Sequence, residues 1–355
     1  MLSKKFIFLA LVVASIGVGS ATAQDIIDAL RLVSSKYASR YIEPFTSAFG
    51  ADYNTGLFHT ADNGPRKGLH GYFGIKVFAT LIDGSDKRFS TTYTVDVAID
   101  RIVGGKAVTF RAPALVTVRD APTIFGDSLR GSVTVRVLDD IRITVDGEEF
   151  IVAVDTVFTF KTPRGLIDLP LMPAAAPQLE IGTFLGTDVM VRYVPSITSE
   201  DIGRFGLFGG GIRHSISQYF PSLPFHLAIQ GVGQRLFFDD DNGNSIIKLT
   251  TWAVNLQASK KFGALTVFGG VQAEDANIKI SYVFDSPNLI ENGQSGDEVA
   301  VVDAPDPVTI GLDLDGANLF RGIIGLSVKA GPVLFSADAN LGTVRTGSFG
   351  IGVTF

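Results

Sequence analysis

The residue types that could perform a hydrolysis occur together at one place, Gly126–Leu129, whose sequence is Gly-Asp-Ser-Leu. The serine could act as a nucleophile, but it would need a histidine base that an acid orients, commonly as Asp-x-x-His. The sequence contains four histidines, His59, His70, His214 and His226. None of them has an aspartate three residues before it. The block therefore favours a polar turn between strands, and we expect that the protein is not an enzyme.

A second candidate for chemistry is the acidic stretch Asp239–Asn244, which has the composition of a calcium-binding loop. An EF-hand loop needs glycine at its sixth position and glutamate at its twelfth. Counting from Asp239, these positions hold Asn244 and Thr250. The stretch is therefore predicted to be a solvated hairpin tip, and loose binding of divalent ions stays open.

No cofactor and no metal site are predicted. The histidines form no His-Glu-x-x-His motif, and the chain has no cysteine for a zinc site or a disulfide. Glycines cluster at 209–211, at 231 and 233, and at 350 and 352. Because these clusters lie in predicted strands with no helix after them, they favour strand bending or close packing over a phosphate-binding loop.

The N-terminus has the three parts of a secretory signal peptide, residues 1–23. Lys4 and Lys5 precede an apolar stretch, Phe6–Val18, and residues 21–23 are the small residues that a signal peptidase needs. A spanning helix needs about 20 apolar residues, and this stretch is shorter. We therefore expect cleavage before Gln24 and export of the chain.

Composition narrows the destination of the exported chain. Without Lys4 and Lys5 the formal charge changes from −6 to −8, because 30 − 2 = 28 basic residues face 36 acidic ones. The chain has no basic block, so nucleic acid is not an expected partner. Hydrophobic residues make up 46% of the chain, yet no run after the signal reaches the roughly 18 apolar residues of a spanning helix. These features together predict the outer membrane of a Gram-negative cell.

The final stretch, residues 347–355, alternates strictly. Phe349, Ile351, Val353 and Phe355 are apolar, and the residues between them are small or weakly polar. In a strand this pattern places one apolar face opposite a polar one, as a membrane barrel requires. A terminal strand that ends in an aromatic resembles the signal read by the barrel-insertion machinery of the outer membrane. These four residues are therefore the predicted assembly signal, and the expected partners are that machinery and outer-membrane lipid.

Residues 24–68 form a predicted N-terminal helical segment. Within Asp25–Phe49 apolar residues recur every three or four positions, which builds one apolar stripe. Pro44 should end or kink the helix. Two interpretations stay open: a helix packed on some core, and a helix that caps or plugs the periplasmic end of a barrel.

The next part of the chain changes from regular to irregular strands. Segments 71–82 and 88–100 flank a turn and are predicted to form a hairpin. Residues 101–172 carry charges on both faces, which predicts a plug or a long-loop subdomain partly outside the bilayer. The prolines at 170, 173 and 177 lack a backbone donor and should break any ladder.

From Gln178 onward alternation returns, with connections of two kinds. Residues 261–263 and 331–332 make tight turns, whereas the Asp239 stretch and residues 286–307 are long and acidic. Short turns on one side and long loops on the other are typical of a bacterial outer-membrane barrel. The fold class is therefore predicted to be all-β: a transmembrane antiparallel β-barrel over residues 69–355 with a short N-terminal helix. We expect about 12 strands, within about 10–14 and even-numbered.

Polar residues opposite the apolar rows are the candidates for lining the lumen. They are Asp188, Arg192, Asn255, Gln257, Gln272, Glu274, Lys329, Asp338 and Asn340. Two interpretations stay open for this set of mixed charge. The side chains pair with one another in a narrow closed barrel, which is favoured because opposite charges satisfy each other well in a confined space, or they line a passage.

Three segments, 41–61, 168–194 and 209–230, resemble an uncharacterised family of outer-membrane β-barrel proteins of Bacteroidota type. The layout of an N-terminal segment followed by a barrel is more distantly similar to fatty-acid-transporter-type barrels. The resemblance implies a barrel in the outer membrane. It transfers no functional residue and implies nothing about cargo, and the charged block 101–165 departs from it most.

The sequence predicts an outer-membrane barrel with one of two functions. The first is a passive channel or transporter for a small molecule, hydrophobic ones included. The alternative is a structural or surface-interaction barrel without transport activity. Both functions require the same alternation of strands, so the sequence does not separate them.

Overall fold

The computed structural model describes residues 35–63, 69–137, 141–145, 147–152, 157–182, 185–199, 203–239, 243, 245–284 and 308–355. The described chain forms two compact units. The first contains the described residues up to Asp83, Leu169–Ser281 and Gly311–Phe355, and the second contains Gly84–Asp168 and Tyr282–Ile310. The predicted signal peptide, residues 1–23, lies outside the described residues.

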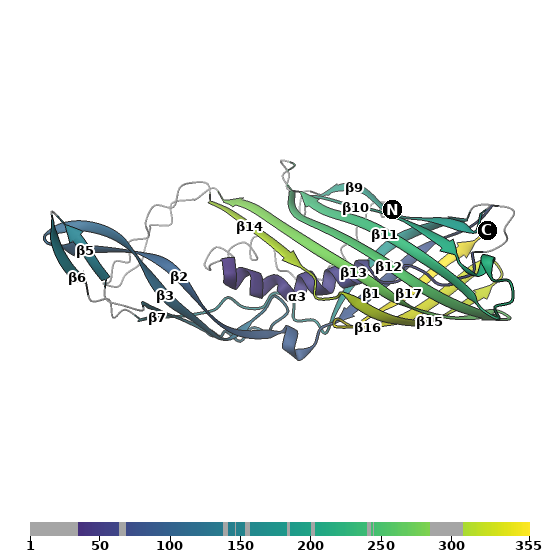
Figure 1. Cartoon of the computed structure of the whole chain (residues 1–355), viewed down its shortest axis with the longest axis horizontal. Coiled ribbons are helices and arrows are strands. Elements are labelled where there is room, and N and C mark those ends of the chain that lie inside the picture. Colours follow the sequence, from purple (N-terminus) through teal and green to yellow (C-terminus); the bar gives the residue numbers. More distant parts are fainter. Residues whose placement is uncertain are drawn as a thin grey trace, which may run out of the picture. The chain divides into compact units, whose positions relative to one another are not determined.

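The first unit is a closed antiparallel barrel of ten strands. In ring order they are β12, β11, β10, β9, β8, β1, β17, β16, β15 and β13, and pairing between β12 and β13 closes the ring (Figure 1). The bounds are His70–Leu81 (β1), Leu171–Gly182 (β8), Thr187–Ser199 (β9), Gly203–Ser215 (β10), His226–Asp239 (β11), Ser245–Phe262 (β12), Leu265–Phe284 (β13), Phe320–Ala330 (β15), Val333–Gly342 (β16) and Thr346–Thr354 (β17). One more strand, β14 (Val308–Asp315), pairs with β13 outside the ring.

The second unit has two small sheets of its own. The first sheet has the order β2-β3-β4-β7, and the second is the hairpin β5–β6. The bounds are Gly84–Asp86 for the 3-10 helix η2, and Arg88–Val103 (β2), Lys106–Pro122 (β3), Ser132–Val137 (β4), Ile141–Val145 (β5), Glu148–Val152 (β6) and Val157–Lys161 (β7). The irregular block predicted over 101–172 therefore belongs to a sheet-forming unit that begins earlier, at Gly84.

The predicted hairpin of 71–82 with 88–100 is wrong. β1 pairs with β17 and β8, whereas β2 pairs with β3 in the other unit. Alternation identifies a strand and its faces but not its partner, and the chain leaves the barrel between these two strands. The ring holds ten strands rather than about 12 because β2–β7 form the second unit and β14 lies outside the ring.

β8 also corrects an expectation, because it runs through Pro173 and Pro177. On one side it pairs with β1 along its whole length, with Pro173 opposite Ala79 and Pro177 opposite Ile75. On the other side only Gln178–Gly182 pairs with β9. The prolines lie outside that short pairing, so on the β9 side their missing N–H groups leave no ladder bond unmade.

The barrel has an apolar outside and a polar inside. Many large hydrophobic side chains of its strands are exposed, including Phe73, Ile75, Val77, Phe208, Ile212, Trp252, Val254, Leu256, Ile324, Leu326, Phe349, Ile351 and Val353. The opposite rows are buried and carry Lys, Arg, Asp, Glu, Gln and Asn side chains. This is the inverse of a water-soluble protein, whose buried side chains are mostly apolar.

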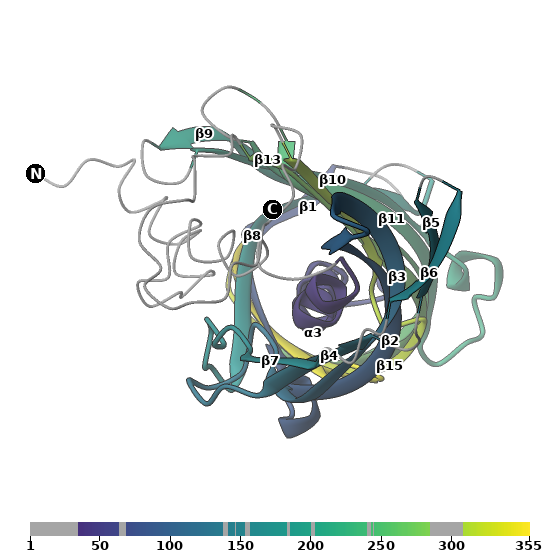
Figure 2. The same ribbon diagram turned by 90° about the vertical axis from the view of Figure 1, so that its left-hand side faces the viewer.

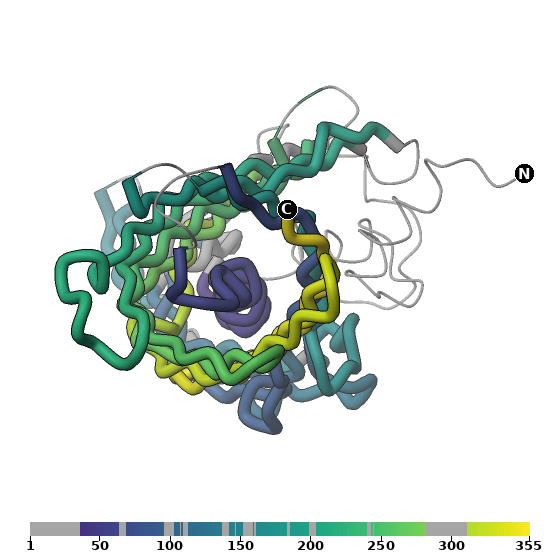
Figure 3. Tube along the Cα trace, turned by 90° about the vertical axis from the view of Figure 1, so that its right-hand side faces the viewer, coloured from purple at the N-terminus to yellow at the C-terminus, as the bar shows by residue number. Residues whose placement is uncertain are grey.

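The barrel encloses a helix, α3 (Ser35–Tyr53), which lies within the ring of strands when viewed along the barrel (Figures 2 and 3). The helix continues through Pro44, where the sequence predicted an end or a kink. Tyr41, Ile42 and Thr46 around the proline are all buried. Burial of these side chains inside the barrel therefore stabilises a helix that propensity alone would interrupt.

Candidate functional site

The interior of the barrel is filled by one continuous segment, residues 35–63, which we call the plug. Tyr53 at the end of α3 packs against Phe78 of β1, with ring centroids 5.5 Å apart. The Thr80 hydroxyl, near the Leu81 end of β1, donates to the Ala48 carbonyl over 3.0 Å. The N-terminus of α3 therefore points towards the Leu81 end. Residues 54–63 continue towards the other end, where the plug meets the start of β1.

A glycine allows the chain to turn out of the helix. Gly56 has a φ of +64°, in the left-handed region that L-residues with a Cβ avoid. A Cβ on Gly56 would also lie 3.0 Å from the Ser348 hydroxyl of β17. The turn therefore needs glycine for both its backbone conformation and its closeness to the wall.

Arg192 of β9 is the main anchor of the plug. Its side chain is fully buried, and its guanidinium donates to the carbonyls of Tyr53 (2.8 Å), Thr55 (2.8 Å) and Gly56 (3.0 Å). A further bond goes to the Gln178 side chain at 2.8 Å. The last carbonyls of a helix have no intrahelical partner and carry its partial negative charge. A cation at this position satisfies them and fixes the end of α3.

A second arginine binds the same end of the helix from the opposite wall. Arg321 of β15 donates to the Ala51 carbonyl over 3.1 Å and to the Thr55 hydroxyl over 2.7 Å. It also pairs with the buried Glu274 carboxylate of β13. The Thr55 hydroxyl lies 2.7 Å from that of Thr346 on β17. Side chains from β13, β15 and β17 therefore come together at the end of α3.

Glutamine and serine side chains of the wall, together with Arg213, bind further plug carbonyls. Gln234 donates to Tyr53 (2.6 Å), Gln272 to Asn54 (2.9 Å), Gln230 and Gln178 to Leu57 (3.3 and 3.4 Å), Ser327 to His59 (3.1 Å) and Arg213 to Thr60 (2.9 Å). Buried carbonyls without a partner are costly, and here the wall supplies the partners that a sheet or helix would.

The structure brings most of the predicted lumen residues together. Asp188, Arg192, Asn255, Gln257, Gln272, Glu274, Asp338 and Asn340 are all buried inside the barrel. Among them, Gln257 donates to Asn255 at 2.8 Å, and Asn340 donates to Asp338. The exception is Lys329, which is exposed at the end of β15 and lines a cavity at the mouth of the barrel.

Several functional residues were missed from the sequence. Lys76, Gln178, Glu180, Arg213, Gln230, Gln234 and Arg321 are also buried inside the barrel. The signal was present for Lys76, because it lies in the row opposite the exposed Ile75 and Val77. Arg213 and Arg321 lie in strands interrupted by glycines, where alternation is harder to follow.

A cluster of ionisable groups lies at the end of the plug that contains residues 59–63, which we call the lower plug. Arg213 of β10 lies 2.5 Å from Asp188 and 3.3 Å from Glu180. His59 Nδ1 lies 3.5 Å from Glu180, and His70 Nε2 lies 3.5 Å from Asp188. Burial lowers the pKa of the His59 imidazole, although the nearby Glu180 carboxylate opposes that shift. We call these five residues the mouth cluster.

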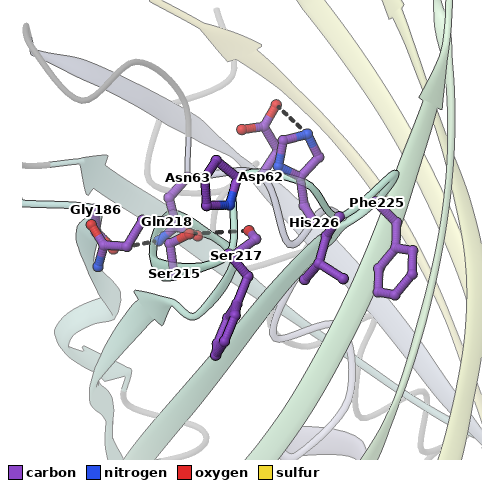
Figure 4. Close-up of a pocket in the computed structure, with 11 residues that line it drawn as sticks. Asp62, Asn63, Gly186, Ser215, Ser217, Gln218, Phe225 and His226 are labelled. Carbon is purple, nitrogen blue, oxygen red and sulfur yellow. Dashed lines mark hydrogen bonds and ion pairs between the residues drawn. The ribbon is translucent and has the colours of Figure 1, made fainter.

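Two cavities open at this end of the barrel, and both are bordered by Asp62 of the plug. One has a volume of about 220 Å³ and lies beneath the β10–β11 connection, which contains the 3-10 helix η3 (Ser217–Tyr219). Figure 4 shows Ser215, Gln218 and Phe225 along its wall, and the His226 ring beside Asp62, with Nε2 3.8 Å from the carboxylate. The other has a volume of about 230 Å³ and is bordered by the mouth cluster and Phe355.

The remaining candidates from the sequence have structural partners. Asp127 of the Gly126–Leu129 turn accepts hydrogen bonds from Arg88 (2.8 Å) and from the Leu129 N–H (2.9 Å). Asp239 pairs with Arg204 at 2.5 Å, whereas Asp240–Asn242 and Asn244 lie outside the described residues. Within the described part of the chain, no three His, Asp or Glu side chains are grouped to hold a metal ion. No helix there is long and apolar enough to cross a membrane.

The predicted assembly row lies on the outside of the barrel. Phe349, Ile351, Val353 and Phe355 are 45–60% exposed. The backbone of Phe355 pairs with Gly71 at the start of β1, with N···O distances of 2.9 and 3.1 Å. The terminal residue therefore completes the seam between the last strand of the chain and the first strand of the barrel.

A comparison with protein families matches residues 3–355 to the family of unknown function DUF6588. The chain belongs to this family. No curated protein sequence matches it. The family match does not show that the chain is of Bacteroidota type or similar to fatty-acid-transporter-type barrels.

Solved structures give only distant likenesses. Each of the following alignments covers 81% of this chain. CdiB from Acinetobacter baumannii aligns with 10% identity, a TM-score of 0.16 and 60% of its own length. OccK3 from Pseudomonas aeruginosa aligns with 10% identity, a TM-score of 0.19 and 95% of its length. A BenF-like porin from Pseudomonas fluorescens Pf-5 aligns with 8% identity, a TM-score of 0.18 and 98% of its length. Scores this low leave the function to be argued from the chain's own geometry.

Proposed function

We propose that this protein is an outer-membrane β-barrel that is closed at rest by its own N-terminal plug. It serves as a structural or surface-interaction barrel rather than as an open passive channel. The observation that carries this proposal is the set of hydrogen bonds from the wall to the carbonyls of Ala51, Tyr53, Asn54, Thr55, Gly56, Leu57, His59 and Thr60. A lumen built to solvate a permeant molecule would not direct these groups to its own backbone.

The placement in a membrane rests on the two faces of the barrel. An outward row of Phe, Ile, Val and Leu side chains suits lipid, and the buried charges suit only the inside. The closed ring leaves no unpaired sheet edge across most of the wall, as a hydrocarbon environment requires.

The lengths of the connections between strands support one orientation of the barrel in the membrane. At the end that contains Phe355, β12 joins β13 and β15 joins β16 through two residues each, 263–264 and 331–332. At the Leu81 end the chain leaves for the second unit, and β13 joins β14 through residues 285–307. Bacterial barrels have short periplasmic turns and long outer loops. The Leu81 end of the barrel would therefore face the cell surface, where its longer connections would be open to interaction.

A second candidate function, gated uptake of a small molecule, is favoured by the chemistry of the plug contacts. Most backbone carbonyls of residues 54–60 are held by hydrogen bonds, and water can replace such bonds at a small net cost. Displacement of the plug would also expose the apolar cluster in which Leu57 and Phe58 pack against the wall, so the seated state is the favoured one. Uptake would then depend on a displaced plug, not on a permanently open lumen.

Conductance in planar lipid bilayers separates these functions. A matched pair of variants uses Gly50, where an added Cβ would lie 2.3 Å from the Ala276 Cβ, and Gly231, where it would meet open space. We expect the wild type and Gly231→Leu to be silent. Gly50→Leu should conduct if displacement of the plug opens a passage, because its side chain cannot fit between α3 and β13.

The outcomes assign the function as follows. Steady conductance of the wild type would contradict the closed barrel. Silence of a Gly50→Leu protein that still shows the gel-mobility shift of a folded barrel would remove gated uptake and leave the structural role.

A further inference from the structure

The cavity of about 230 Å³ at the Phe355 end has a composition that the closure of the barrel does not explain. Its floor is the lower plug, at His59, Thr60 and Asp62, and its walls come from β1, β8, β9, β10, the β12–β13 turn, β15, β16 and β17. Three acidic and three basic side chains border it: Asp62, Glu180 and Asp188, and Arg213, Lys261 and Lys329. The formal charges of these six side chains therefore balance. The acidic side chains of the strands and the two lysines lie on different parts of the ring of strands.

The acidic side is built from neighbouring strands. Glu180 of β8 and Asp188 of β9 are buried and share Arg213 as a partner. Glu180 also interacts with the buried Lys76, so Asp188 is the carboxylate of this pair that is left to face the cavity. Its Oδ1 atom accepts no hydrogen bond from the described residues, and His70 Nε2 lies 3.5 Å from it. Asp62, half-exposed on the plug, adds a second acceptor.

The basic side lies elsewhere on the ring. Thr266 of β13 is opposite Lys261 of β12 and also opposite Ser327 of β15, which places Lys329 near the same rim. Lys261 and Lys329 are both exposed. Neither forms an ion pair with a carboxylate among the residues that the structure describes. In ring order β10 and β11 separate the acidic strands β8 and β9 from β12.

We propose that this cavity binds a small zwitterion, of the amino-carboxylate class. Its anionic group would lie between Lys261 and Lys329, and its ammonium group would face Asp188 and Asp62. A dianion would meet the buried carboxylates, and a dication would meet the lysines, so each would have one end in a repulsive field. The proposal does not depend on whether the barrel conducts, because the cavity is open at the mouth while the plug is seated.

The test uses three probes of equal length on the purified full chain in detergent. Calorimetric titrations would compare 4-aminobutanoate, succinate and 1,4-diaminobutane at low ionic strength. We expect saturable binding of 4-aminobutanoate, and binding about tenfold weaker or more for the other two, as like charges repel across a cavity of this size. Equal affinity for all three probes, or no saturable binding of 4-aminobutanoate, would overturn the proposal.

Variants locate the binding on the molecule. Lys261→Gln combined with Lys329→Gln should weaken 4-aminobutanoate about tenfold. The matched control is Lys248→Gln combined with Lys279→Gln. These two lysines are opposite each other on β12 and β13, at the far end of the barrel. The control removes the same charge and should leave binding unchanged; an equal loss in both double variants would show a diffuse charge effect and contradict the assignment.

The acidic side needs its own variant. Asp62→Asn keeps the shape of the side chain and lies on the plug, not in a strand, so the ring of strands is preserved. It should weaken 4-aminobutanoate and strengthen succinate. A variant that weakened both probes alike would contradict the placement of the ammonium group.

Discussion

At the scale of single residues, the plug is held by Arg192 above all. The methionine in Arg192→Met has a similar length but no donors, so the carbonyls of Tyr53, Thr55 and Gly56 would lose their shared partner. We expect the free energy of unfolding to fall by on the order of 3 kcal/mol, as each buried acceptor left unpaired costs about 1–3 kcal/mol. Urea titrations in detergent, followed by circular dichroism, would measure the loss.

The control for this variant is Arg345→Met. Arg345 pairs with Asp83 near the rim, and the two side chains are 50% and 51% exposed. Exposed ion pairs contribute about 0–1 kcal/mol, so this variant should be nearly neutral. Similar losses for both arginines would contradict a special role of Arg192 in seating the plug.

We expect Phe355 to matter more for insertion into the membrane than its small buried surface suggests. Its ring is 60% exposed, so Phe355→Ala removes little buried surface. We predict that this variant reaches the outer membrane in much smaller amounts, because we expect the terminal aromatic to be part of the signal for insertion. Phe208→Ala, on the outside of β10 and 61% exposed, is the matched control. Membrane fractions from cells would be compared with the melting of refolded samples.

The two halves of that comparison separate assembly from stability. Both variants should melt within a few degrees of the wild type after refolding in detergent, because burial of a Phe side chain contributes only about 1.5–3 kcal/mol even when complete. If Phe355→Ala inserted as well as Phe208→Ala, the terminal residue would be an ordinary strand end.

At the scale of elements, the sequence predicted strands well and their partners poorly. The alternation predicted from Gln178 onward corresponds to the end of β8 and to β9–β17. Period-two alternation depends only on which face is polar, and that information is local. The partner of β1 is not local, since β17 lies at the other end of the chain.

Prolines were the second source of error among the elements. Pro44 lies inside α3, and Pro173 and Pro177 lie inside β8. The rule that proline breaks a helix or a ladder assumes that the missing N–H bond was needed. In β8 the proline-bearing half pairs on one side only, a circumstance that a sequence does not reveal.

At the scale of the whole molecule, the barrel and its polar interior could be predicted, but the occupant of that interior could not. The candidate lumen residues came from alternation, and eight of the nine are buried. Two of them, Arg192 and Gln272, bind backbone carbonyls of the plug that lie more than one hundred positions away along the chain, at Tyr53 and Asn54. A carbonyl carries no sequence signature, so a cap, a plug and a helix on another core all remained compatible with residues 24–68.

The central claim is that the plug occupies the lumen, and a disulfide tests it directly. The Thr55 and Thr346 hydroxyls are 2.7 Å apart, and the chain has no cysteine of its own. Thr55→Cys with Thr346→Cys should therefore cross-link under mild oxidation of cell membranes, as judged by mass spectrometry of linked peptides. The control pair is Thr55→Cys with Thr354→Cys, eight positions further along the same strand and so about 26 Å away, far outside disulfide reach. We predict a cross-link in the first pair alone; no cross-link at Thr346, or equal cross-linking at Thr346 and Thr354, would contradict a plug seated in the barrel.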